Sequence, residues 1–301
     1  MNEHIFLESL KNNAKLIKEL PLEYYKDKSF IIRCLQENGS AIKYVMTDFK
    51  RDKEVILAAV SQYGMAIRHI SANYKNDKEI IRAAITQNGG VLEFIDPAYR
   101  KDYFIVTTAL KTTPNMIRLI DPTFLDNKEL IMNVIKKEPS LVVHASDQLK
   151  QEPDIVTALI NKTPMALCWI NTKFKKDKEF VEELNKRKYY DGNGREIPNH
   201  SFKCADVSLK TDKEFVLKII RYNKWAFRHI DNSLKEDHSF VLEILKLSDI
   251  NFRHVPDNLR SNEKFIESAK EINPIVVEVW EESQKRMISP SHFNFLNRRI
   301  I

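Results

Sequence analysis

The chain has 301 residues, of which 43% are hydrophobic, 30% charged and 10% aromatic, and its formal net charge is +6. This length allows a sizeable core, and the composition is too apolar for an intrinsically disordered protein. No apolar stretch approaches the roughly 20 residues of a membrane-spanning helix, and residues 1–4 lack the basic start of a signal peptide. We therefore expect no membrane insertion and no classical secretion signal.

In chain order, a motif of Asp-Lys followed by Glu or Ser recurs every 25 residues. The motif, or a degenerate copy of it, begins eleven units, which start at residues 2, 27, 52, 77, 102, 127, 152, 177, 212, 237 and 262. Only the step from 177 to 212 is longer, by ten residues. A strict period over the whole chain predicts a repeat protein rather than a compact helical bundle.

Each unit has the pattern of two helices. The Asp or Asn at its start is a good N-cap, and the apolar residues that follow recur four residues later, which predicts one buried face of a helix about ten residues long. A Gly or Pro, such as Gly39 or Pro114, then ends the first helix or opens a second one of about two turns. A further polar cap before a proline, as at Asp96, predicts one more helical turn, and an apolar anchor such as Phe49 closes the unit.

A two-helix unit of this size cannot bury its own apolar face, whereas stacked neighbours can. We therefore predict an all-α protein, a single α-solenoid domain over residues 1–301 with about eleven helix-turn-helix repeats. The extra residues form a loop or hairpin insertion near 186–197, within 185–200. The tail at 287–301 is expected to cap the last apolar face, which favours a monomer.

The best-formed units carry Asn-Gly-Ser-Ala-Ile-Lys-Tyr at 38–44 and Phe-Lys-Arg-Asp-Lys-Glu-Val-Ile-Leu-Ala-Ala-Val at 49–60. This pattern resembles the tandem helical repeat catalogued as domain of unknown function 4116. The resemblance covers nearly the whole chain, but its motif is structural. It implies proteins of microbes that live in or prey on protist cells, sometimes secreted effectors, and it carries over no catalytic residues.

The residue after the paired apolar residues of the second helix is basic in seven of the eleven units. These seven residues, here called the basic row, are Lys18, Lys43, Arg68, Arg118, Lys203, Arg228 and Arg253. In a solenoid equivalent positions align, so the row would form a charged surface for an acidic protein segment or for phosphates. The alternative is a solvated helix edge that the Asp and Glu residues of the helix caps neutralise.

The next position of each unit is often histidine or aromatic. The residues of this aromatic row are Tyr44, His69, Phe94, His144, Trp169, His229 and His254. We interpret the position as a half-buried site between repeats that accepts planar rings, with a pH-sensitive stack as an alternative. Histidines on separate layers do not converge on one ion, so we predict no metal site.

The insertion places the turn sequence Asp-Gly-Asn-Gly between two tyrosines and Arg-Glu-Ile, which predicts a hairpin. Tyr189, Tyr190 and Arg195 are candidates for partner contact, because insertions in solenoids often lie on the binding face. The alternative is a neutral loop. Arg195 occupies the third ligand place of a calcium loop, so calcium binding is not expected.

The sequence contains no phosphate-binding loop, no catalytic motif and no paired-cysteine metal motif, so we predict no enzyme activity and no cofactor. The leading hypothesis is a non-enzymatic scaffold that binds a protein partner, and the resemblance suggests an effector of a host-associated microbe. A nucleic-acid-binding repeat protein and an effector enzyme with an unrecognised site are the alternatives.

The three cysteines Cys34, Cys168 and Cys204 are odd in number and widely spaced, which implies no disulfide framework and a reducing location. We therefore expect the protein in the cytoplasm, or delivered into a host cell without a classical signal peptide.

Overall fold

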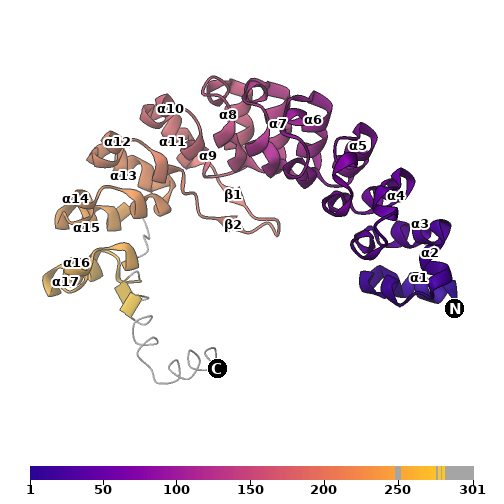
Figure 1. Ribbon diagram of the computed structural model, residues 1–301. Helices are drawn as coiled ribbons and strands as arrows, with labels where there is room; N and C mark the ends of the chain where they lie inside the picture. The colour runs from indigo at the N-terminus through magenta and orange to yellow at the C-terminus, as the bar shows by residue number, and fades with distance from the viewer. Residues whose placement is uncertain (248–251, 276, 279, 282–301) are drawn as a thin grey trace. The chain divides into compact units, whose positions relative to one another are not determined.

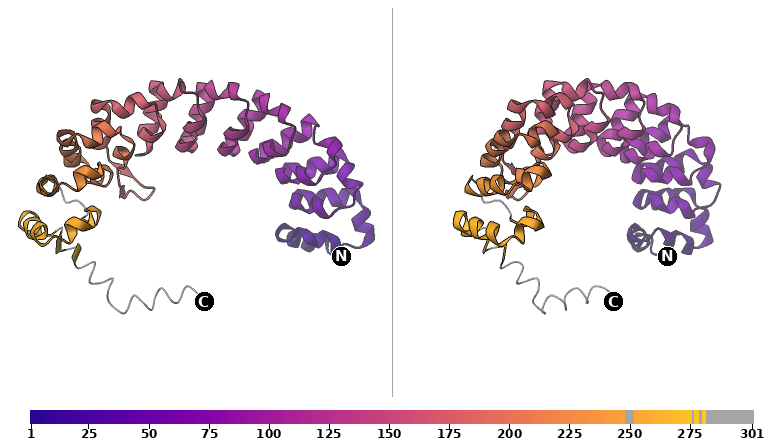
Figure 2. Two further views of the ribbon diagram at one scale, coloured as in Figure 1. Left: turned by 60° about the vertical axis from the view of Figure 1, so that its left-hand side comes forward. Right: turned by 90° about the vertical axis from the view of Figure 1, so that its left-hand side faces the viewer.

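The structure is a computed structural model that describes residues 1–247, 252–275, 277–278 and 280–281 (Figure 1). The described chain is helical apart from one short hairpin, and it forms two compact units, Met1–Leu149 and the part that begins at Lys150. Within each unit, successive helices stack in a row, which two further views also show (Figure 2). The prediction of an all-α solenoid is confirmed. That the repeats form one domain stays a prediction, and the proposed cap at 287–301 lies outside the described residues.

Each repeat begins with an α-helix of eight to ten residues. These first helices are α1 (Glu3–Asn12), α3 (Lys28–Glu37), α4 (Lys53–Gln62), α5 (Lys78–Gln87), α6 (Tyr103–Thr112) and α7 (Lys128–Lys137) in the first unit, and α8 (Pro153–Ile160), α11 (Lys178–Lys186), α13 (Lys213–Tyr222), α15 (His238–Leu247) and α17 (Glu263–Ile272) in the second. The Asp or Asn before the helix caps it, as at Asp52, whose carboxylate accepts from the backbone N–H of Glu54 and Val55. Glu152 is an exception, because it makes no side-chain cap bond and Pro153 follows it.

The second element of most repeats is a 3₁₀ helix rather than an α-helix. The second elements are η1 (Ala14–Glu19), η2 (Gly39–Tyr44), η4 (Gly64–His69), η6 (Gly89–Glu93), η8 (Pro114–Leu119), η10 (Pro139–His144), α9 (Ala166–Trp169), η12 (Ser201–Cys204), η13 (Lys224–His229) and η14 (Phe252–His254). Among them α9 is an α-helix and the others are 3₁₀ helices. Six residues of 3₁₀ helix make two turns, so the expected length is correct although the type of helix was not predicted.

A third, shorter helical element links each repeat to the next. These elements are α2 (Leu22–Lys26), η3 (Phe49–Arg51), η5 (Ala72–Tyr74), η7 (Pro97–Lys101), η9 (Pro122–Asp126), η11 (Leu149–Gln151), α10 (Thr172–Lys176), α12 (Val207–Thr211), α14 (Asn232–Lys235) and α16 (Asp257–Arg260). Their carbonyls accept hydrogen bonds from the following repeat, as when the N–H of Ser71 donates to the Lys50 oxygen at 3.1 Å. The linking element is therefore part of the contact between repeats.

The apolar faces that the period predicts are buried between neighbouring repeats. The helices α3, α4 and α5 contact one another in sequence, and α11, α13, α15 and α17 do the same in the second unit. Helix α4 buries Val55, Ile56, Ala59 and Val60, each with 0% exposed surface. Burial of such side chains contributes about 25 cal/mol per Å² of apolar surface, so stacking is the main source of stability.

Three glycines allow the closest approach between repeats. Gly39, Gly64 and Gly89 open the second helix and none of them adopts a positive φ, so of the two roles expected for this position, ending the first helix or opening the second, the structure shows the second. A Cβ atom at Gly64 would overlap the carbonyl oxygen of Ala84 in the next repeat, and Gly39 and Gly89 have equivalent neighbours. Glycine is needed there because any side chain would push the repeats apart.

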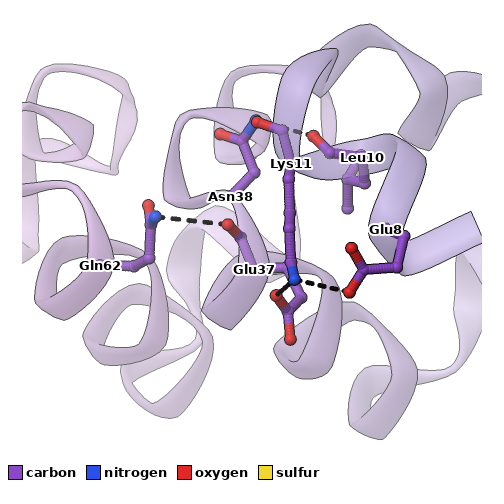
Figure 3. A network of polar contacts seen from close by, with 6 residues as sticks. All are labelled: Glu8, Leu10, Lys11, Glu37, Asn38 and Gln62. Carbon is purple, nitrogen blue, oxygen red and sulfur yellow. Dashed lines mark hydrogen bonds and ion pairs between the residues drawn. The ribbon is translucent and has the colours of Figure 1, made fainter. Parts of the chain in front are cut away.

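Polar side chains bind backbone groups of the adjacent repeat where the first helices end (Figure 3). The Asn38 amide donates to the Leu10 oxygen at 2.9 Å, and the Gln62 amide donates to the Glu37 oxygen at 3.3 Å. The Gln62 side-chain oxygen also accepts from the Gly39 N–H at 2.6 Å. These contacts satisfy free carbonyl and N–H groups at the helix ends, which would otherwise be costly to bury.

The insertion forms the predicted hairpin. Strands β1 (Tyr189–Tyr190) and β2 (Glu196–Ile197) are antiparallel, with Tyr189 opposite Ile197, and Gly194 takes a φ of 74° in the turn. A buried network of amides fixes the returning chain, because Asn223 donates to the Asn185 side chain at 2.6 Å and to the Asn199 carbonyl at 2.9 Å. The insertion is thus anchored to the repeats on both sides of it.

Candidate interaction surface

The basic row lies at the ends of the second helices, and its described side chains are exposed. Lys18, Lys43, Arg68 and Arg118 lie in the first unit, and Lys203 and Arg228 lie in the second. Lys43, Arg68, Arg118, Lys203 and Arg228 each follow a buried pair, such as Ala41 and Ile42 before Lys43, and Lys18 follows the half-buried Leu16 and the buried Ile17, so the helix turns the next side chain towards solvent. The side chain of Arg253 lies outside the described part of the structure.

The aromatic row is mostly half-buried, as predicted for a site that accepts planar groups. His144 alone among its seven members is exposed. Cations of the basic row lie over rings of the next repeat: Lys18 Nζ is 5.1 Å from the centre of the Tyr44 ring, and Arg68 Cζ is 4.8 Å from that of Phe94. The two rows are therefore coupled, because each such ring supports a cation at the surface.

The carboxylates at the first-helix caps pair with a different set of lysines. Lys53 Nζ lies 2.9 Å from both Asp77 and Glu79 of the next repeat, and Lys28 bridges the preceding pair in the same way. Lys178 and Lys213 bind the caps Asp212 and Asp237, each at 2.6 Å. The Asp-Lys-Glu motif thus links neighbouring repeats and does not neutralise the basic row.

A second group of cations, which the sequence analysis missed, supports the same surface. Lys50, Lys175, Lys210 and Lys235 each follow an apolar anchor and donate to the carbonyl of the residue at the basic-row position seven residues earlier, for example from Lys210 to the Lys203 oxygen at 2.6 Å. Burial lowers the pKa of Lys210 and of Lys235. The recurrence of Lys directly after the anchor was the available signal.

In the second unit, a histidine pair lies next to the basic row. The His200 Nδ1 and His229 Nε2 atoms are 3.0 Å apart, and the His200 ring also approaches the edge of Trp225. Burial, together with the positive charges of Arg228, Lys203 and Lys210 and the neighbouring His200, lowers the pKa of His229 to about 4. His200 was not among the residues predicted from the sequence, because it lies beside the insertion and outside the repeat register.

This histidine pair predicts a loss of stability in mild acid. Because the pKa of His229 is near 4 in the folded protein and near 6.5 in the unfolded chain, the unfolded state binds more protons between these values. Stability should therefore decrease as the pH falls from 6.5 towards 4, by about 1–2 kcal/mol after allowance for partial solvent exposure. The free energy of unfolding, measured by urea denaturation at pH 7 and at pH 5, tests this prediction.

The variant His229→Phe isolates this effect, because the equivalent position holds Phe94 in another repeat. It should lose a large part of the pH dependence, whereas His4→Asn, at an exposed histidine, should keep the wild-type dependence. An equal slope in wild type and His229→Phe would contradict the assignment.

The insertion offers fewer contact residues than the sequence analysis expected. Tyr190 is 58% exposed and Arg195 is exposed, but Tyr189 is only 7% exposed and its hydroxyl donates to the Ile160 oxygen at 2.9 Å. The expectation that both tyrosines face a partner is wrong for Tyr189, because that side chain points inward from the hairpin and anchors it. Tyr190 and Arg195 remain candidates.

The prediction of no disulfide is also wrong, because Cys168 and Cys204 are bonded, with their Cα atoms 4.9 Å apart. Cys168 occupies the basic-row position of its repeat and Cys204 the aromatic-row position of the next, so they correspond to Arg68 and Phe94. Solenoid stacking brings these positions together. Disulfides form in oxidising settings, so the cysteines no longer favour a reducing location. The cytoplasmic location stays a prediction.

Neither a membrane-spanning segment nor a metal centre emerges from the described residues. None of their helices is long and apolar enough to cross a membrane, and they contain no group of three or more His, Cys, Asp or Glu side chains placed to hold a metal ion.

The stacked helices and their cross-repeat contacts define a helical repeat protein of the α-solenoid class. The model of the family described as domain of unknown function (DUF4116) matches residues 2–50, 52–100, 127–175 and 177–235. The chain belongs to this family, and each match covers two of the 25-residue repeats, the last with the insertion. No curated protein and no solved structure matches the chain.

Proposed function

We propose that the chain is a non-enzymatic scaffold that binds acidic segments of a protein partner through the basic-row residues that each of its two units carries. The observation that carries the proposal is that Lys18, Lys43, Arg68, Lys203 and Arg228 are exposed and form no ion pair within the described structure. Arg118 differs, because it pairs with Glu93.

The alternative is that the basic row is a solvated helix edge whose charge the cap carboxylates neutralise. Ion pairs between those carboxylates and other lysines weaken this alternative. Lys28, Lys53, Lys178 and Lys213 already pair with first-helix cap carboxylates. Each of the basic-row cations that form no ion pair among the described residues lies over an aromatic ring or next to a further lysine. Together they create a positive surface, which favours association with an acidic partner.

Charge reversal tests this proposal. The variant Lys43→Glu, Arg68→Glu, Lys203→Glu and Arg228→Glu should weaken binding to a partner identified by affinity capture at least tenfold, with little change in melting temperature, because these side chains are exposed. The control reverses three exposed lysines outside the row, Lys15, Lys26 and Lys162, and should bind normally. Binding that is equal in both variants would refute the role of the row.

The same experiment separates a protein partner from nucleic acid. Random RNA and DNA are titrated at about 50 mM salt, where phosphate contacts are strongest. We expect no binding that depends on the row. Tight, salt-sensitive binding that the row variant loses would replace the protein-scaffold proposal with the nucleic-acid alternative.

A further inference from the structure

A groove separates the first helices α6 and α7, away from the basic row. It has a volume of about 550 Å³, and its floor is formed by Leu110, Leu130 and Val134. Its lining comes only from first helices, whereas the basic row lies on second helices. The groove is within the size range of ligand sites in proteins.

The repeat sequence explains why this pair of helices leaves a groove. The equivalent position of successive repeats is occupied by Ile32, Leu57, Arg82 and Thr107. Ile32 and Leu57 are half-buried, and the Arg82 guanidinium reaches over the Phe104 ring, 5.1 Å from its centre. Thr107 is shorter, and its hydroxyl donates to carbonyls of its own helix at Tyr103 and Phe104. The side chain that would occupy the space between α6 and α7 is therefore missing.

The two ends of the groove differ in charge. Lys111, Lys136 and Lys137 line it where α6 and α7 end, whereas Glu129 and Tyr103 line it where the helices begin. Lys137 donates to the Lys111 carbonyl, but neither the Lys111 nor the Lys136 ammonium has an acidic partner among the described residues. The lysine end is therefore suited to an anionic group, next to an apolar floor.

From this arrangement we infer that the α6–α7 groove is a second binding site, which takes a short extended peptide with acidic residues beside an apolar one. The acidic side chains bind at Lys111 and Lys136, and the apolar side chain covers Leu110 and Val134. A ten-residue helix is about 15 Å long, which four or five residues of extended chain can follow. The site goes beyond the proposed function, because it does not involve the basic row.

The test pans a displayed library of random eight-residue peptides on the full chain and measures the selected peptides by fluorescence polarisation. We expect selected peptides to combine Asp or Glu with a large apolar residue. Lys111→Glu with Lys136→Glu should weaken their binding at least tenfold. Thr107→Leu should do the same by filling the groove as Leu57 does in its own repeat. Melting temperatures show that the variants fold.

Two controls make the result specific to this groove. Lys15→Glu with Lys26→Glu, and the variant with four reversed basic-row charges, should bind the peptides like wild type. No enrichment, a consensus without acidic residues, or insensitivity to the two groove variants would overturn the inference. Loss of binding in the basic-row variant alone would assign the peptides to the other surface. Full displacement by octanoate, an aliphatic carboxylate, would assign the groove to small acids and also overturn it.

Discussion

Replacing Cys168 and Cys204 with serine is expected to lower the free energy of unfolding of the second unit by about 3–4 kcal/mol. The disulfide joins residues 36 positions apart and closes a loop that contains α10, α11 and the hairpin. In the chain-entropy account, closing a loop of this length removes many conformations from the unfolded chain. The insertion interrupts the regular repeat at this point, so the covalent link stabilises the stacking where the sequence departs from its period.

Chemical denaturation with and without reductant measures this effect. Reductant should lower the midpoint of wild type but leave the Cys168→Ser, Cys204→Ser variant unchanged, which controls for the buried Cys34 thiol. The pair Cys168→Arg with Cys204→Phe copies Arg68 and Phe94 and should recover about 0.5–1 kcal/mol. A wild-type midpoint that reductant does not move would contradict the disulfide.

Replacing Gly64 with alanine should destabilise the first unit by about 1–2 kcal/mol. The added Cβ overlaps the Ala84 carbonyl oxygen, and relieving such overlap in a packed interface costs about 1–3 kcal/mol. Alanine also restricts the unfolded chain, which offsets about 0.4–1 kcal/mol of this cost. The overlap is the larger effect, because the contact is with backbone rather than with a flexible side chain.

The matched control for Gly64→Ala is Gly192→Ala in the insertion, where a Cβ would meet no atom within 4 Å. Its free energy of unfolding should change by less than about 0.5 kcal/mol. Gly39→Ala and Gly89→Ala should resemble Gly64→Ala, because both would also overlap an alanine carbonyl oxygen of the next repeat. An alanine that stabilised the protein at these three positions would refute the close-approach explanation.

The repeat architecture could be predicted because its determinants are local and recur. An Asp such as Asp52 caps its own helix, and the apolar residues beside it recur with the helix period, so a single unit already contains this information. The hairpin followed from the turn residues around Gly194, which act within a few residues. Local rules therefore sufficed for the elements and for their order.

Features that depend on contacts between repeats could not be predicted in the same way. Glycine is needed at position 64 because the Ala84 carbonyl oxygen of the next repeat lies against it. To predict the disulfide, one must know that a basic-row position faces the aromatic-row position of the next repeat. The groove beside Thr107 appears only when equivalent side chains are compared in the stack. His200 lies outside the register, so no periodic signal marked its approach to His229.

Hydrogen–deuterium exchange of the full chain, with and without the captured acidic partner, tests the central claim most directly. We expect the partner to slow exchange in the second helices whose exposed basic-row cations form no ion pair among the described residues, η1, η2, η4, η12 and η13, while the first helices far from them keep their free-state rates. Protection confined to the first helices, with exchange unchanged in those five elements, would contradict the assignment of the basic row as the binding surface.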